Sequence, residues 1–68
     1  MRISARNQIK GTVVEVRKGA TTSHVTLDVA GHMIKAAITN EAVEELQLAE
    51  GKTAYAIIKA SDVMIAID

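Results

Sequence analysis

The sequence predicts a small all-β domain with one short helix. Apolar and polar residues alternate along several short segments, as they do in half-buried strands. The alternation gives way once to helical spacing, between Asn40 and Leu46. The chain has 68 residues, which leaves room for one domain over residues 1–68.

The first strand is predicted over residues 9–17, from Ile9 to Arg17. Its apolar positions change parity at Val13 and Val14, which indicates a bulge or a bend between two packing faces. A turn over residues 18–22 follows, because glycine, alanine and threonine replace the alternating pattern.

The second strand begins at His24, and the third is predicted from Met33 to Thr39. The sequence Ala30-Gly31-His32 between them predicts a tight hairpin, because glycine adopts positive φ without steric cost. The alternation in the second strand places Val25, Leu27 and Val29 on one face, and His24, Thr26 and Asp28 on the other.

A short helix is predicted after the third strand, ending before Gly51. Asn40 is a good N-cap, with Thr39 as the alternative, and three glutamates follow early in the segment. Negative charge at that end is favoured by the helix dipole. Val43 and Leu46 sit at helical spacing, so one face of the helix is apolar.

Two further strands are predicted over residues 52–59 and 63–67, separated by Ala60-Ser61-Asp62. Three strands, a helix and two strands match a five-stranded Greek-key barrel of OB type, whose helix lies between the third and fourth strands. The strand count is compatible with this barrel but does not by itself select it.

The composition predicts an oligomer. A domain of this size has a small core and usually gains stability from disulfides, metal or association. The chain has no cysteine, its two histidines are not at a compact metal-ligand spacing, and Tyr55 is its only aromatic residue. Because 49% of the residues are hydrophobic, apolar surface remains for contacts between copies of the chain.

Charge and hydropathy argue against nucleic-acid and membrane partners. Eight Lys and Arg residues balance eight Asp and Glu residues, so bulk electrostatics would hold neither nucleic acid nor an anionic membrane. No apolar run approaches the roughly 20 residues of a membrane helix, and the N-terminus does not resemble a signal peptide. We therefore expect a cytoplasmic protein. No catalytic motif is present, so an enzyme is not expected.

Two clusters of hydrogen-bond donors stand near the chain ends. Ser4-Ala5-Arg6 opens the domain and Lys59-Ala60-Ser61 nearly closes it. Each combines a cation, a hydroxyl and a small residue that lets backbone N–H groups come close. They can form an anion site only if the fold or a neighbouring subunit brings them together.

A site made only of donors suits a fully deprotonated tetrahedral dianion. Every oxygen of such an anion is an acceptor, so guanidinium, ammonium, hydroxyl and backbone N–H groups complement it. Phosphate keeps a proton near neutral pH and would need an acceptor. Thr39, at a strand-to-helix junction, is a further candidate hydroxyl donor.

The N-terminal run Ser4–Gln8, the segment Ala37–Thr39 and the stretch Lys59–Ser61 resemble the molbindins, small molybdate-binding proteins of the Mop family. The resemblance covers essentially the whole chain and implies the OB-type barrel. It also implies molybdate or tungstate as ligand, with no organic cofactor and no metal ion ligated directly. The family pattern is a homohexamer, a trimer of dimers, whose interface site corresponds here to Ser4, Ala5, Arg6, Thr39, Lys59, Ala60 and Ser61.

Molbindins also hold anions at further sites between subunits, on or near symmetry axes. The candidate here is the first turn, which offers small residues, hydroxyls and backbone N–H groups with Lys18 beside it. An ordinary turn is the alternative interpretation. The turn comprises Gly19, Ala20, Thr21, Thr22 and Ser23.

Structural roles compete with ligand binding at each of these positions. Arg6 and Lys59 could be ordinary solvated charges, and Ser4 could tie down the first strand. For the whole chain, the leading hypothesis is intracellular molybdenum storage and homeostasis. The alternatives are a regulatory or assembly module that senses molybdate for a partner protein, and an OB-type nucleic-acid-binding module.

Overall fold

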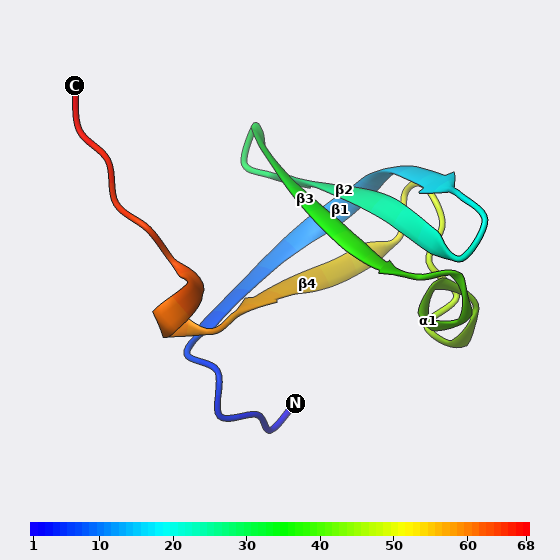
Figure 1. Ribbon diagram of the computed structural model, residues 1–68, viewed down its shortest axis with the longest axis horizontal. Coiled ribbons are helices and arrows are strands. Elements are labelled where there is room, and N and C mark those ends of the chain that lie inside the picture. Colours follow the sequence, from blue (N-terminus) through cyan, green and yellow to red (C-terminus); the bar gives the residue numbers. More distant parts are fainter.

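The computed structural model describes residues 1–68 and contains one antiparallel sheet, one α-helix and one 3-10 turn (Figure 1). The strand order in the sheet is β3-β2-β1-β4. The all-β class with one short helix is therefore confirmed. The elements are β1 (Asn7–Lys18), β2 (Thr22–Val29), β3 (His32–Thr39), α1 (Asn40–Glu45), β4 (Thr53–Ile58) and η1 (Ala60–Asp62).

The prediction of five strands is wrong, because the sheet has four. Residues 63–67 pair with no strand of the same chain and lead away from the sheet as an extended arm (Figure 1). The connection after β4 contains no Gly or Asn to supply the positive φ that tight hairpins use. It forms a 3-10 turn instead, so the chain does not reverse along β4. We call residues 63–68 the C-terminal arm.

The predicted irregularity in the first strand is a β-bulge. Val13 pairs with Leu27 of β2 and Glu15 pairs with Thr26 of β2, so Val14 between them has no partner on β2. The freed backbone groups of Val13 bond to the loop before β4: its N–H donates to Lys52 O at 2.8 Å, and its carbonyl accepts from Gly51 N at 2.8 Å. The bulge thus lets β1 turn from one neighbouring strand to the other.

The hairpin and the helix start follow the local sequence signals. Ala30 and Gly31 take φ of 51° and 89°, as a two-residue hairpin turn of the primed type requires. The helix N-cap is Thr39, the alternative, and not Asn40: the Thr39 hydroxyl accepts from Ala42 N at 3.0 Å. Asn40 is the first helical residue. Helix α1 has six residues, and no helix here is long and apolar enough to cross a membrane.

The helix ends in a left-handed residue that is not glycine. Gln47 has φ of 53°, and the N–H groups of Gln47 and Leu48 donate to Glu44 O and Val43 O, as in a Schellman motif. We expect Gln47→Gly to raise the free energy of unfolding by about 0.5–1 kcal/mol, because glycine adopts this φ without strain. Denaturant unfolding at fixed protein concentration measures it. Ala42→Gly, within the helix, should instead destabilise by about 1 kcal/mol; equal destabilisation by both changes would contradict the explanation.

Gly11 marks a close approach of β1 to β2. A Cβ added there would lie 2.8 Å from Asp28 O and 2.8 Å from Val29 Cγ2. Gly11→Ala should therefore destabilise the protein by about 1–3 kcal/mol, the usual cost of overpacking. The neighbouring Thr12→Ala, which removes an exposed side chain, is the control. Similar unfolding midpoints for Gly11→Ala and the unmodified chain would show that the strands move apart without cost.

One chain makes a very small core. Only six of 68 residues are buried, and four of these are hydrophobic: Val13, Val25, Leu27 and Val43. Thr26, expected on the polar face, is also buried at 7% exposure. Much of the apolar side-chain surface is left in contact with solvent in a single copy.

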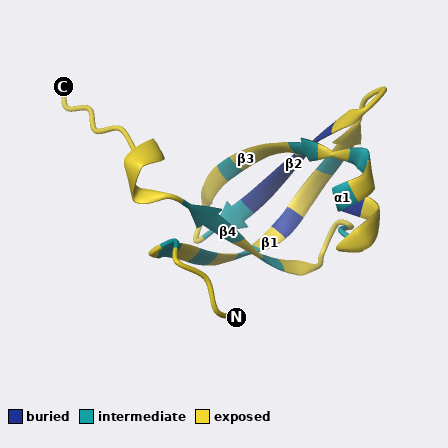
Figure 2. Ribbon diagram, turned by 60° about the horizontal axis from the view of Figure 1, so that its bottom comes forward, coloured by how far each residue is buried: buried dark blue, intermediate teal, exposed yellow.

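An apolar groove lies between the two edge strands. The sheet curls so that β3 and β4 line the same hollow, of about 750 Å³, although they do not pair with each other (Figure 2). Of its 16 lining residues, 13 are hydrophobic. The inward-facing ones include Ile34, Ala36 and Ile38 of β3 and Ala54, Ala56 and Ile58 of β4. Unpaired edges beside an apolar groove are a ready template for another strand.

Candidate functional site

The two donor clusters meet because β1 starts where β4 ends. These strands are antiparallel, and Asn7 at the start of β1 pairs with Ile58 at the end of β4. The Asn7 side chain reinforces this corner by donating from Nδ2 to Ile58 O at 3.0 Å. Residues 3–6 and 59–61 therefore leave the sheet at the same place, although more than fifty positions separate them in the sequence.

A pocket of about 490 Å³ lies at this corner. One water occupies about 30 Å³ in the liquid, so a single tetrahedral anion would leave most of the pocket unfilled. The pocket of one chain is therefore wider than a single anion. Its lining is Ile3, Ser4, Ala5, Arg6, Lys59, Ala60 and Ser61.

The side chains of this pocket are positive or neutral and not engaged elsewhere. The ion pairs of the chain are Arg17–Glu15 and Lys18–Glu44, so Arg6 and Lys59 have no acidic partner. No carboxylate lines the pocket. The hydroxyls of Ser4 and Ser61 make no hydrogen bond within the chain. An anion would meet donors that need not break an existing contact.

The second cluster is shaped by the turn η1. Asp62 N donates to Lys59 O at 2.9 Å, and Val63 N donates to Ala60 O at 3.3 Å. The N–H groups of Ala60 and Ser61 take no part in either bond, as expected at the start of a helical turn. They add backbone donors to the ammonium group of Lys59 and the hydroxyl of Ser61.

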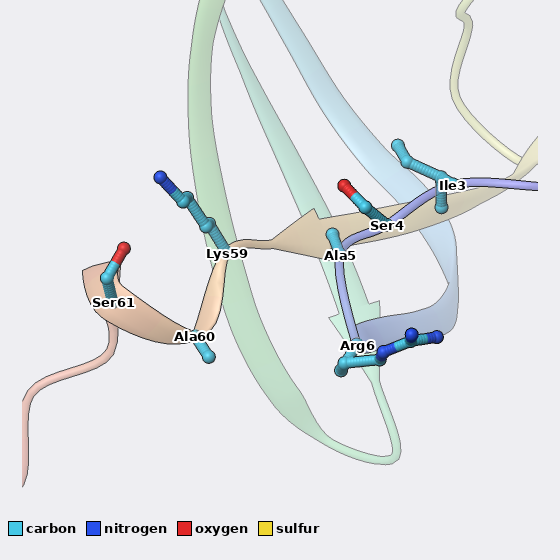
Figure 3. A pocket seen from close by; sticks show the side chains of 7 residues that line it. All are labelled: Ile3, Ser4, Ala5, Arg6, Lys59, Ala60 and Ser61. Carbon is cyan, nitrogen blue, oxygen red and sulfur yellow. The ribbon is translucent and has the colours of Figure 1, made fainter.

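The cations of one chain do not converge on a single point. In Figure 3 the side chains of Lys59 and Ser61 extend to the same side of the turn, whereas the Arg6 guanidinium is directed away from them. Arg6 is exposed in the single chain.

Thr39 is not brought to this pocket. It lies at the other end of the sheet, where it pairs with Thr22 at the start of β2 and caps α1. The twelve-residue strand β1 runs between the two regions (Figure 1). Six of the seven residues predicted for the interface site are thus gathered in one chain, and Thr39 lies with the candidate second site.

The second candidate site is a turn that is bound tightly to the helix start. Gly19 N donates to Thr22 O at 2.8 Å, and Asn40 N donates to Thr21 O at 2.9 Å. Ser23 is fully buried, and its hydroxyl donates to Asn40 Oδ1. The donors of Gly19 and Ser23 are therefore already used, which leaves Ala20, Thr21 and Thr22 as the exposed part of this turn.

The sequence interpretation missed Ile3. Its side chain lines the pocket beside Ser4 and is 46% exposed in one copy. Only its position directly before Ser4 could have indicated it, because an apolar residue near a terminus carries no signal of its own.

Comparison with known proteins gives the family. The model of the TOBE domain matches residues 3–65. Molybdenum-pterin-binding protein 1 of Clostridium pasteurianum is 50% identical over 96% of this chain and 97% of its own. The chain belongs to the molbindin family.

Solved structures of similar proteins share its fold. A molybdate-binding protein from Sporomusa ovata superposes with a TM-score of 0.94 at 34% identity, over 98% of this chain and 100% of that one. The cytoplasmic molybdate-binding protein ModG, in a form with molybdate bound, gives a TM-score of 0.89 at 46% identity. That match covers 94% of this chain and 46% of the ModG chain. This molbindin thus has the architecture of proteins that bind molybdate.

Proposed function

We propose that this molbindin binds molybdate and tungstate as free oxyanions between subunits of a homo-oligomer, for cytoplasmic molybdenum storage and homeostasis. The observation that carries the proposal is the pocket at the corner of β1 and β4. It combines a lysine, two serine hydroxyls and free backbone N–H groups with no carboxylate. Such a lining complements an anion whose every oxygen is an acceptor. The protein is a binding protein and not an enzyme.

The ligand is the bare oxyanion and not a molybdenum–pterin complex, although relatives are named for a pterin. A pterin presents N–H donors and a flat aromatic face, so it needs side-chain acceptors and a flat partner. The pocket offers no acceptor side chain other than the two serine hydroxyls. Tyr55, the only aromatic residue, lies on β4 outside it.

Each site is completed by a second subunit. The pocket is too large and open for one anion, and Arg6 points away from Lys59 in the same chain. Arg6 therefore serves the site of a neighbouring subunit, and a neighbour supplies the second cation here. Thr39 is likewise remote from the pocket of its own chain, so it enters such a site only from another copy.

The C-terminal arm supports the dimer. Val63, Ile65 and Ile67 alternate along it and are 47%, 86% and 93% exposed, although they are apolar. Five residues of strand span about 17 Å, close to the roughly 20 Å of the six-residue β4. We infer that the arm of one copy lies in the apolar groove between β3 and β4 of a second copy. Three such dimers form the hexamer that the family resemblance implies.

The turn over residues 19–23 is proposed as a second anion site between subunits, with less support than the pocket. Ala20, Thr21 and Thr22 are exposed, while Gly19 and Ser23 shape the turn from within the chain. Copies of this turn that met near a symmetry axis would surround an anion with hydroxyl and N–H donors. Lys18 forms only an exposed ion pair with Glu44 at 3.8 Å, which is too weak to withhold its charge from a nearby anion.

Equilibrium dialysis tests the function. The purified protein should retain molybdate and tungstate against an excess of phosphate, because the lining has no carboxylate to accept the proton of phosphate and the two serine hydroxyls are its only acceptor side chains. Sulfate, also fully deprotonated, is the stringent competitor. Equal retention of molybdate and sulfate would remove the selectivity, and no retention of molybdate would remove the function.

A further inference from the structure

The turn η1 lines the anion pocket and also leads directly into the C-terminal arm. Ala60 and Ser61 line the anion pocket, and the next residue but one begins the C-terminal arm. In Figure 1 the arm leaves the molecule directly from this turn. The direction of the arm is therefore set by the backbone angles of the same residues that would hold the anion.

This turn is held weakly within the chain. Its backbone bonds are one of 2.9 Å and one of 3.3 Å, the second at the long end for a hydrogen bond. No side chain caps its start, and residues 59–68 are all exposed. Segments with few buried contacts and exposed hydrogen bonds open at low free energy. Nothing in a single empty chain fixes the arm in one direction.

We propose that the bound oxyanion acts as a latch on this turn, so that filling the pocket controls how firmly the C-terminal arm is seated on a second copy. The inference rests on the proposed function. An anion held by Ser4 on one side and by Lys59 and Ser61 on the other ties the root of the arm to the start of β1. The arm then starts from a fixed position, and less freedom remains to be lost when it pairs with the neighbour.

Electrostatics act in the same direction. In the assembled site the Lys59 ammonium of one copy meets the Arg6 guanidinium of another, and no carboxylate lines the pocket. Two unpaired cations repel each other when the site is empty, and a dianion removes the repulsion. Anion binding and subunit association therefore strengthen each other. By thermodynamic linkage, the factor by which the anion raises the association constant of the subunits equals the factor by which association raises the affinity for the anion.

Subunit exchange measures the latch. Oligomers labelled with ¹⁵N are mixed with unlabelled ones, and native mass spectrometry follows mixed species with no added anion, with molybdate and with sulfate. We expect molybdate to slow the exchange by about 10-fold or more, within the range of typical coupling factors. Hydrogen exchange of residues 63–67 should slow in parallel.

Variants separate this inference from the function itself. Lys59→Gln should exchange equally fast with and without molybdate, whereas Lys10→Gln, an exposed change outside the pocket, should respond as the unmodified protein does. Unchanged exchange in a protein that retains molybdate by dialysis would overturn the latch and leave the function standing. A protein that retains no molybdate would overturn both.

Discussion

Replacing either pocket cation by alanine should weaken retention of molybdate by about 10- to 150-fold while leaving the subunit folded. Losing a charged hydrogen bond costs about 1.5–3 kcal/mol, and about 1.4 kcal/mol corresponds to a factor of ten. Arg6 and Lys59 are exposed and form no ion pair, so neither supports the fold. Equilibrium dialysis of Arg6→Ala and Lys59→Ala gives the result directly.

Matched controls separate the local contact from the loss of a charge. Arg17→Ala and Lys10→Ala each remove a charge of the same kind from β1, outside the pocket. Both should retain molybdate normally. If Arg6→Ala and Lys59→Ala do so as well, the site assignment is wrong even where the function is right.

The same two variants test whether the site is shared. If one copy supplies Arg6 and its partner supplies Lys59, a mixed dimer of the two variants contains one doubly defective site and one intact site. Random mixing would restore about one site in four across the whole population. A site contained within one chain would regain nothing on mixing, because every chain would still lack one of its cations.

The second large effect is expected in the C-terminal arm. Ile65→Asp should raise the dissociation constant of the dimer by at least about 100-fold. It removes the burial of a large apolar side chain, about 1.5–3 kcal/mol for each arm, and places a carboxylate in an apolar groove. The side chain of Met64, the residue before Ile65, points to the opposite side of an extended arm. Met64→Asp should therefore have a small effect on the dissociation constant.

Sedimentation velocity over a range of protein concentrations distinguishes these variants. The unmodified protein and Met64→Asp should sediment as one large species, whereas Ile65→Asp should dissociate at micromolar concentration. Dissociation of both variants to the same degree would mean that net charge and not strand-like alternation governs the arm. An intact oligomer in both would show that the arm is not part of the interface.

Local sequence signals predicted the elements that depend on local energetics. The parity change at Val13 and Val14 indicated the bulge, and Gly31 indicated the hairpin, because both reflect steric preferences of a few residues. The start of the helix was predicted to within one residue, whereas its end at Glu45 lies well before Gly51, the residue used to mark it. Asn40 and Thr39 are both good caps, and the position where β3 ends decided for Thr39.

The fifth strand could not be decided from the sequence of one chain. Val63, Ile65 and Ile67 have the alternation of a strand, and the prediction assigned that strand to the same molecule. Alternation reports that one side of a segment becomes buried, but not which molecule buries it. Within one chain the arm is exposed, and it does not line the apolar groove between β3 and β4.

The candidate site also has features that the sequence could predict and features that it could not. The pairing of Asn7 with Ile58 explains why the two terminal clusters meet. Antiparallel pairing of the first and fourth strands, once these are predicted, places the start of one beside the end of the other. The position of Thr39 at the far end of the sheet and the direction of Arg6 away from Lys59 depend on tertiary geometry. Residue types in a sequence carry no such information.

Native mass spectrometry of the protein loaded with molybdate is the most direct measurement, because it counts subunits and metal atoms in the same ion. Molybdenum should appear on dimers and their multiples, and the single subunit should carry none. A lone chain that kept its anion after dissociation would contradict a cage built by neighbouring copies.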